Sequence, residues 1–397
     1  MKKTKRTAAH SLGPVSGDDP VSLPSFQDEE EFAKISVRHS AAASDEFSFR
    51  LKPQEIARHL NRFVIGQNEA KKVLSVALCD HFQHVRLTRE GKSAPFYQKQ
   101  NVLILGPTGV GKTHLIRSAA DLIGVPFVKA DATKFSETGY VGGDVDDLVR
   151  DLVRRAGGNL QRAEHGIIYL DEVDKLATGS HSGRDVSGRG VQTNLLKLME
   201  DGDVPLISPN DVTGQLQSAI SMARGNSPGG TDVISTKNIL FIASGAFSGL
   251  EGSVSRRQAT RSRKAPTLAD ATTADLIQYG LEPEFIGRLP VRVACHALDT
   301  NDLYKVLAES ESSLIRQYER AFSAYGITIQ FHKDALLLLA GLARTEETGA
   351  RGLMTVLERT FREIKFRLPS SSVRKLTVTK ALAENPAQEL KKLLKRR

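Results

Sequence analysis

The sequence predicts an α/β protein with two domains, the first built on a parallel β-sheet and the second smaller and mainly helical. Short apolar runs alternate with helical patterns along most of the chain, as they do where a parallel sheet is covered on both faces. After about Leu298 the helical patterns dominate. The length of 397 residues also exceeds what one ordinary hydrophobic core serves.

Five short apolar runs predict the strands of the first domain, which we place at residues 49–297. These runs are Asn101–Leu105, Val125–Ala130, Ile167–Leu170, Ile239–Ala243 and Val291–Ala294. Apolar residues at helical spacing predict helices between them, including one that starts at Lys112 and others at Asp144–Arg155 and Val191–Glu200. Two more helices, joined by a tight turn at residues 64–66, are expected before the first strand.

The second domain is expected at residues 298–384. Asp299 is predicted to cap one long helix that runs towards Tyr325. The other expected elements are the strands Ile327–Phe331 and Lys375–Val378 and the helices Lys333–Ala343 and Ala350–Phe366.

Four segments lack a regular pattern. Residues 1–48 are polar, and we expect a disordered tail there. Residues 385–397 are expected to form a basic tail. Residues 203–236, rich in Gly, Ser, Pro and Asn, and residues 252–274, basic and then polar, are expected to be surface loops.

Composition excludes several classes of protein. No apolar run is long enough to span a bilayer, and no apolar segment follows the basic N-terminus as in a secretory signal, so a cytoplasmic protein without a membrane partner is expected. The two cysteines, Cys79 and Cys295, cannot supply a zinc site of the usual spacing. The net charge of +9 is concentrated in basic clusters without interleaved aromatic residues, so nucleic acid is not expected as a partner.

The turn after the first predicted strand matches the complete phosphate-binding loop (P-loop) motif. Its residues are Gly106, Pro107, Thr108, Gly109, Val110, Gly111, Lys112 and Thr113. The glycines let backbone N–H groups face phosphate oxygens, and the following helix adds the positive end of its dipole. We expect Lys112 to reach the β- and γ-phosphates of ATP and Thr113 to hold Mg²⁺.

A second motif follows the third predicted strand. This strand would bring Asp171 to the carboxyl edge of the sheet, beside the metal, with Glu172 placed to orient a water molecule against the γ-phosphate. An Asp–Glu pair at this distance from a P-loop indicates ATP hydrolysis, because a simple nucleotide switch needs no second carboxylate there.

Further segments narrow the class of protein. They are Phe63–Gln67 with Ala70–Leu74, Thr138–Gly142, Glu282–Pro290 and Thr348–Leu353, in that order along the chain. Together with the two motifs they resemble the ClpX family of AAA+ protein unfoldases. Residues 239–247 are similar to both ClpX and its relative HslU. The resemblance implies a P-loop AAA+ large domain, a small α/β lid domain and ATP-driven unfolding of tagged or unfolded proteins.

The resemblance also implies roles for individual residues. Val64 and Ile65 would lie beside the adenine, and Ser244 would be the first sensor. Arg288 would reach the γ-phosphate of the neighbouring subunit, which implies a homohexamer, and Arg351 would contact nucleotide in cis. The alternatives are a surface ion pair for Arg288, a domain-interface salt bridge for Arg351 and a buried serine bonded to backbone for Ser244.

The segment around Tyr140 is expected to grip substrate. Tyr140 and Val141 lie between glycines, and Gly142 would let the loop swing. Exposed apolar side chains usually mark contact surfaces. The resemblance assigns them to a pore loop, and the alternative is a turn whose tyrosine packs on its own domain.

The sequence departs from the family pattern at three places. Residues 1–48 contain no cysteine, so we expect the N-terminal zinc domain of the family to be absent. Residues 251–275 contain no Ile-Gly-Phe tripeptide, the element that docks on the ClpP peptidase. A neutral stretch at 208–232 replaces the Arg-Lys-His loop, and Arg189 stands where the family usually has Glu. Two versions of the function stay open, a subunit that feeds a ClpP-type peptidase and a free-standing remodeller.

Two other classes are less well supported. A nucleic-acid motor shares the ATP site, but the Gly-Tyr-Val-Gly loop lacks the basic tip that such a track requires. A regulatory ATP-binding scaffold would not need Glu172 and Arg288.

Overall fold

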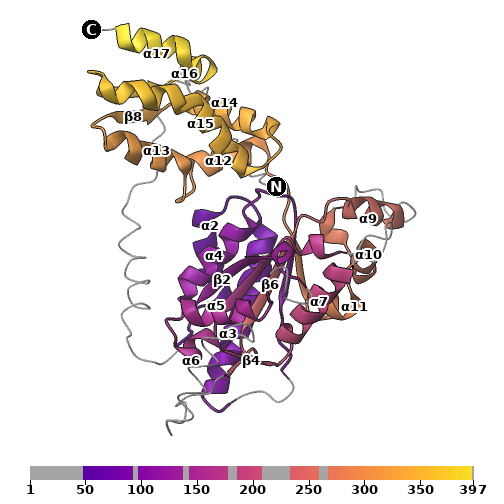
Figure 1. Ribbon diagram of the computed structural model, residues 1–397. Coiled ribbons are helices and arrows are strands. Elements are labelled where there is room, and N and C mark those ends of the chain that lie inside the picture. Colours follow the sequence, from indigo (N-terminus) through magenta and orange to yellow (C-terminus); the bar gives the residue numbers. More distant parts are fainter. Residues whose placement is uncertain are drawn as a thin grey trace, which may run out of the picture. The chain divides into compact units, whose positions relative to one another are not determined.

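A computed structural model describes residues 48–92, 97–136, 143–177, 186–207, 233–258 and 267–395 (Figure 1). The chain divides between Leu298 and Asp299 into two compact units. Within the described ranges, no helix is both long and apolar enough to cross a membrane.

The first unit is built on a five-stranded parallel sheet with the strand order β2-β3-β6-β1-β7. The strands are β1 (Val102–Leu105), β2 (Phe127–Asp131), β3 (Ile167–Asp171), β6 (Leu240–Gly245) and β7 (Val291–Ala294). All five apolar runs therefore form strands, and the predicted α/β fold class is confirmed. The three central strands, β1, β3 and β6, are buried on both faces, which explains why they read as continuous apolar runs.

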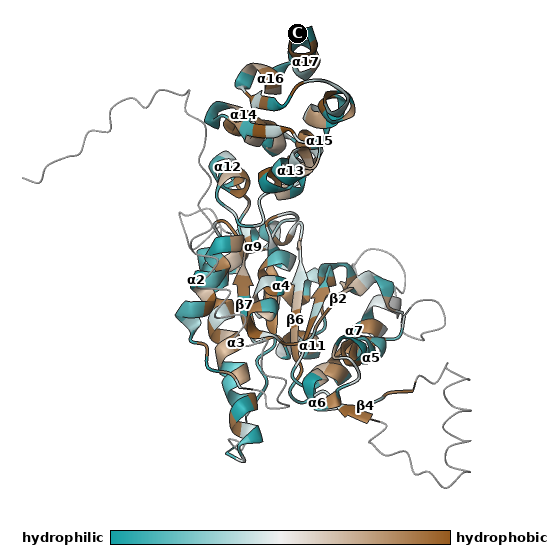
Figure 2. Ribbon diagram, turned by 90° about the vertical axis from the view of Figure 1, so that its left-hand side faces the viewer, coloured by the Kyte–Doolittle hydropathy of each residue, from teal (hydrophilic) through white to brown (hydrophobic). Residues whose placement is uncertain are grey.

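Alternate residues of the strands face two separate cores. Ile167, Tyr169 and Ile242 pack with helices α3 (Asn68–Arg89) and α4 (Lys112–Ile123). Ile168 and Phe241 pack on the other face with α5 (Asp147–Arg155) and α7 (Val186–Met199). Each fully buried aliphatic or aromatic side chain contributes about 1.5–3 kcal/mol, so the two layers fix the sheet firmly. Figure 2 shows the hydrophobic strand β6 beside helices that carry hydrophilic residues.

The remaining elements of the first unit lie between and beyond these. They are α2 (Pro53–Phe63), α6 (Leu160–Ala163), α9 (Leu250–Gln258), α10 (Thr273–Tyr279), α11 (Pro283–Gly287), the 3₁₀ turns η2 (Ala132–Lys134), η3 (Val173–Leu176) and η4 (Leu268–Asp270), and the strands β4 (Asp203–Pro205) and β5 (Val233–Ser235).

Two segments expected to be loops contain regular structure. Strands β4 and β5 pair antiparallel, and each buries one apolar residue, Val204 and Ile234. Helices α9 and α10 each overlap one end of residues 252–274. The carboxylate of Asp275 links them, because it accepts from Arg257 and closes the capping box of Thr272. The composition rule that predicted loops missed these local contacts.

The second unit surrounds a small core of aromatic rings. Its elements are α12 (Thr300–Ala308), α13 (Leu314–Ser323), β8 (Thr328–Phe331), α14 (Lys333–Thr345), α15 (Ala350–Arg367), η5 (Leu368–Ser370), β9 (Lys375–Val378), α16 (Lys380–Glu384) and α17 (Pro386–Lys395). Strands β8 and β9 pair in parallel. The ring of Phe361 packs against those of Tyr318, Phe322 and Phe331.

Two expectations for this unit were wrong. Asp299 does cap a helix, since it accepts from the Asp302 N–H at 2.7 Å, but the helix ends at Ala308 instead of continuing towards Tyr325. Ser313 starts a new helix, because its hydroxyl accepts from the Ile315 N–H and donates to the carbonyl of Leu307. The basic tail expected from residue 385 is instead largely helix α17, which buries Leu390.

Two glycines of the second unit provide a matched test of its packing. A side chain at Gly352, at the start of α15, would lie 2.7 Å from the carbonyl oxygen of Ala343, whereas a side chain at Gly341 would meet nothing within 4 Å. Gly352→Ala should therefore destabilise the unit by about 1–3 kcal/mol, and Gly341→Ala should stabilise it by about 0.5–1 kcal/mol. Hydrogen exchange of the α14 and α15 amides measures both. Equal effects of the two substitutions would contradict this packing.

Candidate nucleotide site

The P-loop begins in a space that only glycine fits. The N–H of Gly106 donates to the carbonyl of Gly245 at the end of β6, and a side chain at Gly106 would lie 2.7 Å from the carbonyl oxygen of Cys295, beyond β7. Gly106, Gly109 and Gly111 all have positive φ. The loop therefore emerges between two strand ends and turns into α4 through conformations that favour glycine.

Lys112 is folded onto this loop. Its ammonium donates to the carbonyls of Gly106, at 2.5 Å, and Pro107, at 2.8 Å, and the residue is only 8% exposed. Thr108 is exposed at the tip of the loop, whereas Val110 is buried. A charged donor held among carbonyls can exchange them for anionic phosphate oxygens, which are stronger acceptors.

The segment expected beside the adenine does reach the loop. A side chain at Gly111 would lie 3.3 Å from Val64 Cγ1, and Ile65 is half-buried next to it. Gln67 fixes this segment, because its amide donates to the carbonyl of His296 at 2.7 Å and accepts from the His296 N–H at 2.9 Å. The turn is therefore tied to the chain that follows β7.

The carboxylate of Asp171 is the centre of the polar network. Thr113 Oγ1 donates to Asp171 Oδ2 at 3.3 Å, and Ser244 Oγ donates to Asp171 Oδ1 at 2.8 Å. The hydroxyl of Tyr169 lies 2.6 Å from Ser244 Oγ and 3.4 Å from Thr113 Oγ1. Ser244 is fully buried, and its hydroxyl binds these two side chains, so in this arrangement it orients the carboxylate.

The network keeps Asp171 ionised. Burial alone would raise the pKa of Asp171, but hydrogen bonds from Lys129 and Ser244 and the charges of Lys129 and Lys112 lower it below its ordinary value. Burial and the nearby Asp171 charge raise the pKa of Tyr169, so the phenol stays protonated. An ionised carboxylate beside a threonine hydroxyl is an oxygen donor set of the kind that Mg²⁺ takes.

Lys129 is a member of the site that sequence reasoning missed. It lies on β2, paired in register with Tyr169, and its ammonium is 2.9 Å from Asp171 Oδ2 and 3.2 Å from Thr113 Oγ1. The signal in the sequence was a lysine within the otherwise apolar run Val125–Ala130.

Glu172 leaves the strand at a sharp turn. Its φ of 60° and ψ of 33° place a non-glycine residue in the left-handed region, which costs about 1–2 kcal/mol, and the residue is exposed. The buried Asp174 holds the following turn, because its carboxylate accepts from the N–H groups of Ala246 and Phe247. Asp174 therefore holds the turn that follows Glu172 against the residues that follow β6.

Arg288 lies at the opposite edge of the sheet. It precedes β7, and its carbonyl accepts from the side chain of Asn101, which precedes β1. The P-loop follows β1, and a strand of four residues is about 13 Å long. The guanidinium pairs with Glu200 at 2.5 Å. The structure therefore separates Arg288 from its own P-loop by the length of the strands.

Two groups of predicted residues lie outside the described part of the first unit. Arg351 is exposed in the first turn of α15 and belongs to the second unit. Tyr140, Val141 and Gly142 lie outside the described residues. A bridge between Phe135 and Gly143 closes the segment that contains them.

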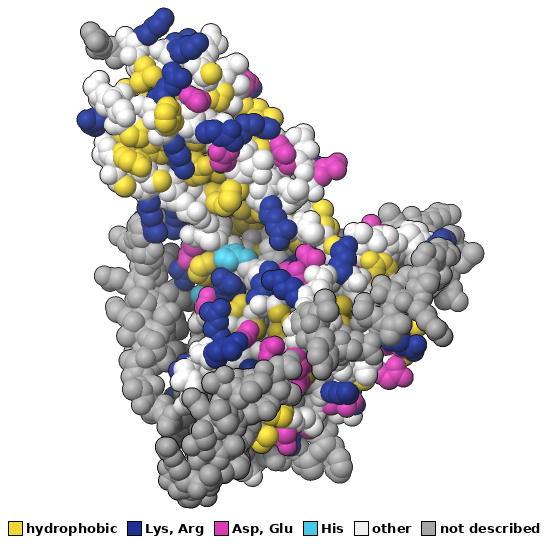
Figure 3. Space-filling model, in the orientation of Figure 1, with side chains coloured by type: hydrophobic (Ala, Val, Ile, Leu, Met, Phe, Trp, Pro, Cys, Tyr) yellow, Lys and Arg dark blue, Asp and Glu magenta, His cyan; other side chains and the backbone are white. Residues whose placement is uncertain are grey.

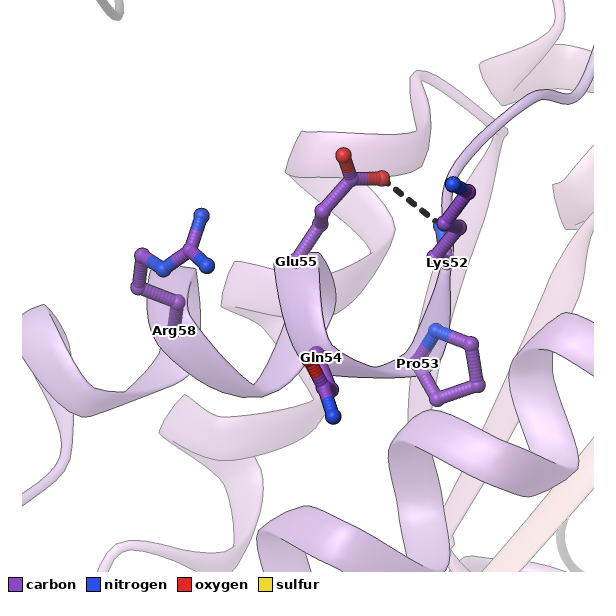
Figure 4. A pocket seen from close by; sticks show the side chains of 5 residues that line it. All are labelled: Lys52, Pro53, Gln54, Glu55 and Arg58. Atoms are coloured by element: carbon purple, nitrogen blue, oxygen red, sulfur yellow. Dashed lines mark hydrogen bonds between the residues drawn. The ribbon is translucent and has the colours of Figure 1, made fainter.

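A pocket lies on helix α2 and is distinct from the loop. Lys52, Pro53, Gln54, Glu55 and Arg58 line it, and Glu55 accepts from the Lys52 N–H at 2.8 Å (Figure 4). None of these residues belongs to the P-loop or to the Asp171 network.

The chain is similar to a known domain family and to several known proteins. The family described as AAA domain (Cdc48 subfamily) matches residues 97–292. The ATP-dependent Clp protease ATP-binding subunit ClpX of Borrelia duttonii (strain Ly) is 40% identical over 83% of this chain and 77% of its own length. The protein named ATP-dependent Clp protease ATP-binding subunit ClpX 3 from Methylococcus capsulatus is 40% identical over 81% of this chain and 77% of its own. The ClpX of Treponema denticola is 37% identical over 85% and 83%.

Glu172 can be tested by removing its charge alone. Glu172→Gln should retain ATP binding and lose hydrolysis by roughly 10²-fold or more, because an amide cannot accept the proton of the attacking water. Fluorescent-nucleotide binding and phosphate release measure the two steps. Glu251→Gln, at an exposed position of α9, is the control. Near-normal turnover in Glu172→Gln would remove this residue from the mechanism.

Proposed function

The chain belongs to the ClpX family, and we propose that it threads protein substrates through the pore of a homohexamer. It is an ATPase, and its function is ATP-dependent unfolding of the ClpX type. The family resemblance predicted from the sequence is thereby confirmed.

Each residue of the site in the first unit has its own role in ATP hydrolysis. The glycine loop and Lys112 bind the β- and γ-phosphates. Thr113 and Asp171 would hold Mg²⁺, which would neutralise charge on the phosphate oxygens. Glu172 orients the attacking water and accepts its proton. Ser244 keeps the carboxylate of Asp171 in place.

The position of Arg288 carries the proposal of a ring. The residue lies at the amino edge of the strands, whereas the P-loop lies at their carboxyl edge, farther away than an arginine side chain extends. An arginine that acts on the γ-phosphate from there must act on another subunit. A ring of identical subunits gives every site one such arginine, which in related nucleotide hydrolases raises the rate by about 10³–10⁵-fold.

The substrate would be gripped by the segment 137–142. The Phe135–Gly143 bridge brings the two ends of this segment together, and the Gly143 N–H donates to the carbonyl of Lys134. Tyr140 and Val141 are the apolar residues of this segment. We propose that they press on an unfolded chain by shape and apolar contact, without reading its sequence.

The two versions of the function differ in whether the chain works with a ClpP-type peptidase or alone. The relatives named above are subunits of Clp protease, which favours a ClpP-type partner for this chain. Residues 251–275 lack the Ile-Gly-Phe tripeptide, which favours a free-standing unfoldase. Unfolding assays with and without the peptidase separate the two, because only the first version yields peptides.

A nucleic-acid motor has weaker support. On the face shown in Figure 3, Lys and Arg side chains are interspersed with Asp and Glu, and no continuous basic track covers the described residues there. A steep dependence of DNA binding on salt concentration would favour that function instead.

Tyr140 provides the most specific test of threading. Tyr140→Ala should abolish unfolding of a tagged protein while ATP turnover is largely retained, because the loop meets the substrate and not the nucleotide. Tyr325→Ala, at a 62% exposed tyrosine of the second unit, is the matched control. If ATP turnover and unfolding fell together in Tyr140→Ala, the loop would be structural.

A further inference from the structure

Lys129 occupies the place of a cation in the candidate Mg²⁺ site. Its ammonium lies 2.9 Å from Asp171 Oδ2 and donates to Thr113 Oγ1 at 3.2 Å. These are the two oxygen atoms that we assign to the metal. The residue reaches them from β2, one of the two edge strands of the sheet, where it pairs in register with Tyr169.

The neighbours of Asp171 leave one oxygen for this contact. Ser244 binds Oδ1 at 2.8 Å, and the Glu172 N–H donates to the same atom at 3.2 Å. Oδ2 therefore faces Lys129 and Thr113. The side chain of Asp171 is 17% exposed and that of Lys129 is 34% exposed, so water screens the pair only in part.

We infer that Lys129 is a built-in counter-cation that competes with Mg²⁺ for Asp171 Oδ2 and Thr113 Oγ1 and that allows nucleotide to bind before the metal. This inference rests on the proposed ATP site and adds a residue that governs its metal dependence.

The role of Lys129 is electrostatic. Without Lys129, an ionised carboxylate would face the phosphates and repel them whenever Mg²⁺ was absent. With Lys129 in place, the carboxylate is neutralised by the protein itself. Mg²⁺ needs oxygen ligands at about 2.0–2.1 Å, which leaves no room for an ammonium on the same oxygen. Binding of the metal therefore requires the side chain of Lys129 to move away.

Two measurements distinguish this role from a structural one. In Lys129→Met, the affinity for a fluorescent ADP in EDTA should weaken by about tenfold, because the repulsion between the Asp171 carboxylate and the phosphates is no longer neutralised. The Mg²⁺ concentration that half-saturates the nucleotide complex should fall by about tenfold, because the competitor is gone. If Lys129 only held β2 in position, its removal would weaken both nucleotide binding and metal binding.

Two further variants complete the test. Lys134→Met removes the same charge from an exposed position three residues after β2 and should change neither value. Lys129→Arg keeps the charge and should retain nucleotide binding in EDTA. Far-UV circular dichroism checks that each variant is folded.

The outcomes distinguish support for the inference, its contradiction, and failure of the proposed function. Opposite shifts of the two values in Lys129→Met, with retention in Lys129→Arg, would support the inference. Unchanged values, a weakening of both, or a Lys129→Arg protein that behaves like Lys129→Met would overturn it. If the unsubstituted protein bound no nucleotide with or without Mg²⁺, the proposed function itself would fail.

Discussion

The in-register pairing of three parallel strands is the constraint on which the site depends. β1 pairs with β6 over Val102–Leu105, and β3 pairs with β6 over Ile167–Leu170. Since the strands run in one direction, the residues that follow them, Gly106 and Asp171, arrive at one edge beside Thr113. A slip of one residue would turn each side chain to the opposite face and move Asp171 away from the P-loop.

The same register places the phosphate loop and Arg288 at opposite edges of the sheet. The carboxyl edge carries the phosphate loop and the carboxylates, and the amino edge carries Arg288, whose backbone Asn101 holds. One chain therefore presents a site on one side of its sheet and an arginine on the other. This arrangement suits a ring in which each subunit completes the site of its neighbour.

The sequence predicted the parts of the fold that depend on local pattern. The three central strands were visible because burial on both faces demands continuous apolar runs, and the P-loop was visible because its glycines serve backbone geometry. The contact of Lys129 with Asp171 was not visible, since it joins residues of neighbouring strands that lie far apart in the chain. The helix break at Ser313 and the burial of Ile234 were missed for a related reason, because single side-chain contacts outweighed the average composition.

The central claim is that each active site is shared between two subunits. The most direct test mixes two variants that are each inactive, Glu172→Gln, which keeps Arg288, and Arg288→Ala, which keeps Glu172. If Arg288 acts in trans, mixed rings contain interfaces with both residues intact, and ATP turnover should rise well above that of either variant alone. If mixing restores no turnover although mixed rings form, Arg288 does not complete a neighbouring site and the account is wrong.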